Sequence, residues 1–230
     1  MKRIFVVGLW IAASAAAVPA GAADLVGRVE VLAKGRPSPG QASQTMVWFE
    51  PDRGGGAPPP ARPLEMVTRK KEFQPRVLVA LRGATVAFPN HDPILHNVFS
   101  VSEARPFDLG LFGAGEAGRV RFDKGGVVRV FCNVHHDMVG YLLVLDTPHH
   151  GVPEANGAFR LRGLPPGPGT LTVWHEQAEP WSARLEVPAA GAAASPVEVR
   201  LELSKPRIPA HLDKLGRSYR ERRRDRYRGD

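Results

Sequence analysis

Short runs of alternating polar and apolar residues recur along the chain and are separated by Gly and Pro. A period of two is the pattern of a β-strand with one buried face. No long amphipathic helix interrupts the runs, so the pattern predicts an all-β fold made of β-sandwiches. The expected strands are residues 25–31, 46–50, 76–80, 84–88, 97–101, 118–122, 127–131, 141–145, 158–162, 169–174, 183–187 and 197–203.

Two departures from simple alternation bear on the organisation of the chain. Residues 141–145 are apolar throughout, which is typical of a strand covered on both faces. Residues 51–63 are rich in Gly and Pro and predict a loop. The part after residue 146 has only about four expected strands, which is thin for an independent core.

The single cysteine of the chain, Cys132, lies in a segment with unusual chemistry. His135 follows three residues later and Met138 three residues after that, so a thiol, an imidazole and a thioether share one tight loop. A second histidine would complete a Cys-His-His-Met set, which is the trigonal copper site with a weak axial ligand that suits electron transfer. His96 is the candidate for that position. The predicted metal ligands are therefore His96, Cys132, His135 and Met138, and the predicted cofactor is one copper ion that cycles between Cu(I) and Cu(II).

Alternatives remain open at two of these positions. His136 competes with His135, since adjacent imidazoles point in different directions and only geometry can decide between them. His91 competes with His96 but lies in a turn bracketed by Pro89 and Pro93. For Cys132 the alternative is a small buried hydrophobic residue, and for Met138 it is an ordinary core methionine.

The N-terminus predicts export. Lys2 and Arg3 precede a short apolar run, and Ala20-Gly21-Ala22 has the small residues of a signal cleavage site. The run is shorter than the ~20 residues of a membrane span, and no later segment is apolar enough to be one. Residues 1–22 are thus expected to be a signal peptide and the mature chain to be periplasmic. That compartment is oxidising, so a lone cysteine without a disulfide partner is a candidate ligand.

The formal charge of +8 is concentrated at the ends of the chain. Residues 204–230 contain ten Lys or Arg and four Asp or Glu, and the signal region adds two cations, which leaves residues 24–203 neutral. A basic tail favours an acidic partner or an anionic surface. Export argues against nucleic acid, so a redox protein with an acidic surface is the expected partner. The alternative is a solvated tail without a docking role. Nothing in the sequence determines the oligomeric state.

Residues 66–146 resemble the cupredoxins, especially plastocyanin- and amicyanin-like members of the type labelled methylamine utilization proteins. The resemblance rests on the segments Glu72–Pro75, Leu81–Val86, Phe88–Asp92, His96–Val98 and Cys132-x-x-His135-x-x-Met138. It implies a Greek-key β-sandwich in which the same four residues bind copper. It also implies that Asn97 hydrogen-bonds across to the cysteine loop, and Asn90 is expected to help shape that region.

A second resemblance concerns the remaining strands. Residues 157–167 resemble the second half of carboxypeptidase-regulatory-like domains, which are small transthyretin-like β-sandwiches, and the strands in residues 24–60 look like the first half. This implies a second, split sandwich made of residues 24–60 and 147–203, with the cupredoxin domain of residues 61–146 inserted into it and a basic tail at 204–230. The alternative is that residues 24–60 add strands to the copper domain.

These features favour an exported type 1 copper protein that carries single electrons. No Ser-His-Asp set, paired carboxylates or open coordination position is evident, so an enzyme is not expected. Two other functions stay open. One is a periplasmic copper-binding or delivery protein that uses the same ligands. The other is an interaction module without redox chemistry.

Overall fold

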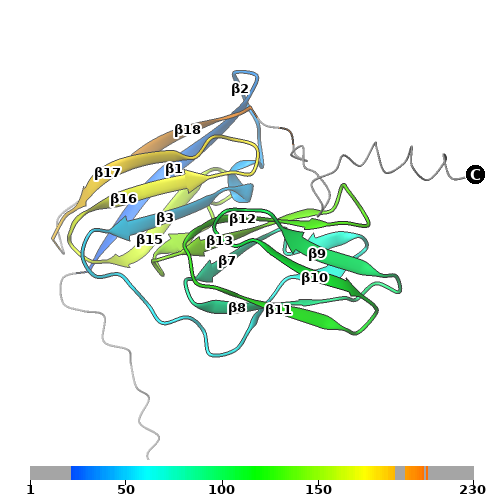
Figure 1. Cartoon of the computed structure of the whole chain (residues 1–230). Coiled ribbons are helices and arrows are strands. Elements are labelled where there is room, and N and C mark those ends of the chain that lie inside the picture. The colour runs from blue at the N-terminus through cyan, green and yellow to red at the C-terminus, as the bar shows by residue number, and fades with distance from the viewer. Residues whose placement is uncertain (1–21, 190–194, 205, 207–230) are drawn as a thin grey trace, which may run out of the picture.

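A computed structural model describes residues 22–189, 195–204 and 206, and within them the fold is all-β, as predicted (Figure 1). The described residues include one short 3-10 helix, η1 (Ala42–Gln44), and no α-helix. They form no helix that is long and apolar enough to cross a membrane. The predicted signal peptide and almost all of the predicted basic tail lie outside the described residues.

One β-sandwich is built from the two ends of the described chain. Its first sheet has the order β15-β1-β18, with β2 paired to β1, and its second sheet has the order β14-β3-β16-β17. The bounds are β1 (Ala23–Ala33), β2 (Arg36–Pro37), β3 (Met46–Pro51), β14 (His150–Gly151), β15 (Ala158–Leu164), β16 (Gly167–Trp174), β17 (Trp181–Val187) and β18 (Val197–Leu203).

The pairing in this sandwich crosses a long stretch of sequence. β1 pairs antiparallel with β15 and parallel with β18, and β3 pairs antiparallel with β14 and β16. β1 and β3 pair with no strand of residues 61–146. The early strands therefore complete the sheets of the late strands.

The second sandwich is formed by the intervening residues. Its larger sheet has the order β10-β9-β12-β13-β7, its smaller sheet the order β11-β8-β4, and β5 and β6 form a hairpin. The bounds are β4 (Leu64–Glu65), β5 (Val67–Arg69), β6 (Glu72–Gln74), β7 (Val77–Leu81), β8 (Ala84–Pro89), β9 (His96–Ser100), β10 (Phe107–Phe112), β11 (Ala117–Phe122), β12 (Gly126–Cys132) and β13 (Val139–Leu145).

β13 is buried on both faces, as its apolar sequence predicted. Leu142 and Val144 belong to the core of the second sandwich. Tyr141, Leu143 and Leu145 lie on the opposite face, in a separate buried cluster. This cluster also contains Met46 and Trp48 of β3, Trp174 of β16, Phe99 of β9 and Phe131 of β12, so it is an apolar seam that joins the two sandwiches.

Candidate metal centre

Three potential ligand atoms converge at one end of the second sandwich. Cys132 Sγ lies 3.6 Å from His96 Nδ1 and 3.8 Å from His135 Nδ1. The ligand atoms of the three side chains all lie within 4.8 Å of one another, and the two imidazole ring centroids are 5.0 Å apart. Of the described residues, these form the one group of three or more His, Cys, Asp or Glu side chains with such spacing.

The alternation of β12 directs the Cys132 thiol into the core. Val128, Val130 and Cys132 are fully buried on one face, in the core of the second sandwich. Phe131, between two of them, faces the seam instead. Cys132 is also paired with Val98 of β9, two residues after His96, and this register brings the ends of the two strands together.

The loop after Cys132 is closed by its own backbone. The Cys132 N–H donates to the Met138 carbonyl at 3.2 Å, and the Met138 N–H donates to the His135 carbonyl at 3.0 Å. These bonds fold His135 back over the cysteine. Met138 is 2% exposed and belongs to the same core cluster as Cys132. Its role as an axial ligand stays a prediction.

The competing histidines lie elsewhere. His136 is exposed, and its Nε2 pairs with Asp137 Oδ1 at 2.8 Å. His91 is also exposed. The structure thus brings His96 and His135, and neither competitor, to the Cys132 sulfur.

His96 makes a second contact that the sequence analysis missed. Its Nε2 lies 2.9 Å from Asp92 Oδ2, and both side chains are buried. Asp92 also accepts hydrogen bonds from the backbone N–H of Lys70 at 2.6 Å and of Lys71 at 2.9 Å. The only signal in the sequence was a carboxylate four residues before a candidate ligand, and that spacing is not distinctive outside a helix.

The surroundings of Asp92 favour its ionised form, and those of His135 favour its neutral form. Burial acts to raise the pKa of Asp92, but the N–H groups of Lys71 and Lys70 and the His96 ring outweigh it, so the pKa is lowered. Burial is the main cause that lowers the pKa of His135, and the charges of His96 and Lys71 act in the same direction. A neutral imidazole is the form that binds a metal ion.

The side chain of Asn90 links residues of the loop before His96. Asn90 Nδ2 donates to the Ile94 carbonyl at 2.8 Å, and Asn90 Oδ1 accepts from the Asp92 N–H at 2.9 Å. Asn90 therefore shapes the loop that leads to His96.

The side-chain hydrogen bonds of Asn97 go to β10 and not, as the resemblance had implied, to the cysteine loop. Its Nδ2 donates to Asp108 Oδ1 at 2.6 Å and to the Gly110 carbonyl at 2.7 Å, both in β10. Its Oδ1 is buried without a hydrogen bond. β10 is bulged between Asp108 and Leu111, and the bulge offers acceptors on the adjacent strand instead of on the cysteine loop.

An apolar rim borders the site. Leu95 precedes His96, Val134 precedes His135, and Leu111 lies opposite Asn97 in the β9–β10 pair. All three are exposed, and so is Ile94. His135 itself is partly exposed, whereas His96 and Cys132 are fully buried. Of the four candidate ligands, His135 is therefore the one that reaches the surface, beside these exposed apolar residues.

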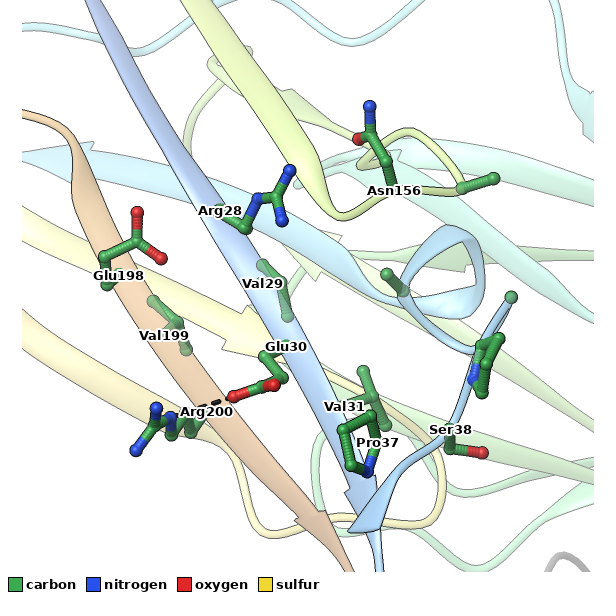
Figure 2. Close-up of a pocket in the computed structure, with 14 residues that line it drawn as sticks. Arg28, Val29, Glu30, Val31, Pro37, Ser38, Asn156, Glu198, Val199 and Arg200 are labelled. Atoms are coloured by element: carbon green, nitrogen blue, oxygen red, sulfur yellow. Dashed lines mark hydrogen bonds and ion pairs between the residues drawn. The ribbon is translucent and has the colours of Figure 1, made fainter.

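A pocket in the first sandwich is unrelated to this site (Figure 2). It runs along β1 and β18 and is lined by charges of both signs, with Glu30 Oε2 paired to Arg200 Nε at 2.9 Å. None of the candidate ligands lines it.

No family model and no curated protein matches the chain. Solved cupredoxin structures match part of it. A novel purple cupredoxin from Nitrosopumilus maritimus is 21% identical over 36% of this chain and 99% of that chain, with a TM-score of 0.33. A reduced mutant of amicyanin is 20% identical over 47% of this chain and 92% of that chain, with a TM-score of 0.35. A copper-containing nitrite reductase from Thermus scotoductus SA-01 is 25% identical over 50% of this chain but 28% of that chain, with a TM-score of 0.36.

These structural neighbours are cupredoxins, but the likenesses are too weak to carry a function. The conclusions below therefore rest on the geometry of the site. The resemblance of the first sandwich to carboxypeptidase-regulatory-like domains stays a prediction.

Proposed function

We propose that the protein is an exported type 1 copper protein that carries single electrons. His96, Cys132 and His135 would hold one copper ion, with Met138 as a weak axial ligand. The observation that carries the proposal is the convergence of the two Nδ1 atoms on the Cys132 sulfur at 3.6 and 3.8 Å. A Cys-His-His set with a distant thioether is the donor combination of blue-copper sites.

The chain supports this function by holding its ligands in one compromise arrangement. A bound copper ion supplies a Cu(I)/Cu(II) couple, for which thiolate and imidazole are both suitable ligands. Cys132 and His96 are fixed on paired strands, and a backbone-bonded loop fixes His135. The packed core around Cys132 excludes water and limits rearrangement between oxidation states, which favours rapid electron transfer.

We further infer a carrier and not an enzyme, because the proposed ligand set leaves no coordination position for a substrate. A redox protein is the expected partner, and it would approach at the partly exposed His135 across the apolar rim of Ile94, Leu95, Leu111 and Val134. The tail at 204–230 would steer a partner with an acidic surface. The periplasm is the proposed location.

The visible spectrum of the protein after Cu(II) loading tests the proposal. We expect a strong thiolate-to-copper charge-transfer band that reductant bleaches. Cys132→Ser should abolish the band. His136→Ala removes the adjacent, exposed imidazole and should leave it intact. Copper binding without the band would favour a delivery protein, and no copper binding would favour an interaction module.

A further inference from the structure

The buried carboxylate of Asp92 joins two parts of the molecule that are distant in sequence. One part is His96, whose Nε2 lies 2.9 Å from Asp92 Oδ2. The other is the turn of the β5–β6 hairpin, where the backbone N–H groups of Lys70 and Lys71 donate to Oδ1 and Oδ2. The Asp92 N–H in turn donates to Asn90 Oδ1, so the carboxylate is itself held in place.

The hairpin turn has a conformation that its sequence does not favour. Lys70 and Lys71 have φ angles of 55° and 59°, in the left-handed region that Gly and Asn adopt most readily. Both side chains are exposed. Two consecutive lysines hold this conformation because both of their N–H groups find an acceptor in the same buried carboxylate.

The same carboxylate determines which nitrogen of His96 is free. An ionised carboxylate can only accept hydrogen bonds, so the contact places the proton of a neutral His96 on Nε2. Nδ1 then carries its lone pair toward Cys132 Sγ, 3.6 Å away. In metal sites a carboxylate at the distal nitrogen of a ligand histidine fixes the tautomer and ring orientation and raises its basicity.

We propose that Asp92 is a positioning residue that holds His96 in its ligand orientation and ties the cationic Lys70–Lys71 turn to the same ring. This inference rests on the proposed function. Its consequence is a site whose buried histidine is oriented before metal binding and whose Cu(II) form is preferentially stabilised. It also keeps two lysines beside the metal centre, where an acidic partner would meet them.

The first test uses the metal-free protein, so its result does not depend on copper. Nitrogen-15 NMR of the imidazole rings should show His96 as the Nε2–H tautomer in the native protein. Asp92→Ala should give a mixture of tautomers. A native spectrum with His96 protonated on Nδ1, or an Asp92→Ala spectrum identical to the native one, would overturn the proposal.

The second test measures copper affinity and reduction potential. Loss of such a carboxylate typically weakens metal binding 10- to 100-fold. With Cu(I) affinity unchanged, each tenfold loss of Cu(II) affinity raises the potential of a one-electron couple by about 59 mV. We expect Cu(II) affinity to fall in the order native, Asp92→Asn, Asp92→Ala, and the potential to rise in that order. Unchanged values in Asp92→Ala would contradict the proposal.

Two controls separate this contact from other causes. Asp137→Asn removes the same charge from the exposed side of the loop and should change the potential far less, because Asp137 pairs with His136 and not with a proposed ligand. If Asp137→Asn shifted the reduction potential as much as the Asp92 variants do, the effect of Asp92 would come from its charge alone, and the positioning role would be refuted. Adding Lys70→Asn and Lys71→Gly to Asp92→Ala relieves the turn, so recovery of the native potential in this variant would assign the effect to hairpin folding and refute positioning.

Asp92→Asn also serves as the variant that preserves volume if Asp92→Ala does not fold. The tautomer test distinguishes failure of this inference from failure of the proposed function. A native protein that lacks the charge-transfer band would refute the proposed function, whereas a native band with unaltered Asp92 variants would refute this inference only.

Discussion

Truncation of Trp174 should break the seam between the two sandwiches without touching the metal centre. Trp174 is 5% exposed at the end of β16, and its ring meets that of Tyr141 of β13 edge-on, with centroids 5.3 Å apart. Replacing a buried Trp by Ala typically costs about 3–5 kcal/mol. For a chain of this size, each kcal/mol lowers the melting temperature by about 2–4 °C. Trp174→Ala should therefore lower it by roughly 6–20 °C.

Differential scanning calorimetry is the assay. Because the seam couples the sandwiches, the native protein should unfold in one transition, and the variant should show a lower transition or two separate ones. Val152→Ala, at an exposed site of the first sandwich, is the control and should change stability by less than about 0.5 kcal/mol. If Trp174→Ala lost less than about 1 kcal/mol in free energy of unfolding and kept a single, unchanged transition, the seam would not contribute to stability as argued.

Two further predictions test local features. His175 Nδ1 accepts the Gln177 N–H at 3.0 Å, and burial is the main cause that lowers the pKa of this histidine, against the charge of Glu176. The unfolded state then binds more protons, so the free energy of unfolding should decline as pH falls below about 6.5, and it should decline less in His175→Gln. Urea titrations in which the native protein and His175→Gln lose stability equally with falling pH would contradict this. Gly157 and Gly163 both have a positive φ, but a Cβ at Gly157 would clash with the Val29 carbonyl oxygen whereas one at Gly163 would meet open space. Gly157→Ala should therefore lower stability more than Gly163→Ala. Equal melting temperatures would disprove the close contact.

Much of the sheet structure follows directly from the pattern of side chains. The alternation in β11 and β12 and the wholly apolar run of β13 each matched a strand. Cys132, His135 and Met138 were recognisable because their spacing within one loop is short and chemically distinctive. His96 could be selected without knowing which strand it pairs with, because Asn97 and the cupredoxin resemblance marked the segment.

The remaining features depended on contacts that are remote in sequence. β10 was missed because Gly110 and a bulge interrupt its alternation. The β5–β6 hairpin was missed because Lys70 and Lys71 lack the Gly or Asn that usually marks such a turn. The Asp92 carboxylate, 21 and 22 residues away in sequence, stabilises this turn by accepting both of its backbone N–H groups. The role of Asn97 was misjudged since its partners lie on that bulged strand.

The most direct test of the central claim is a redox titration of the copper-loaded protein followed at the charge-transfer band. The account predicts that one electron per copper ion bleaches the band, that reoxidation restores it, and that the ion stays bound through repeated cycles. Release of copper on reduction, or a Cu(II) form without the band, would contradict an electron carrier built on His96, Cys132 and His135.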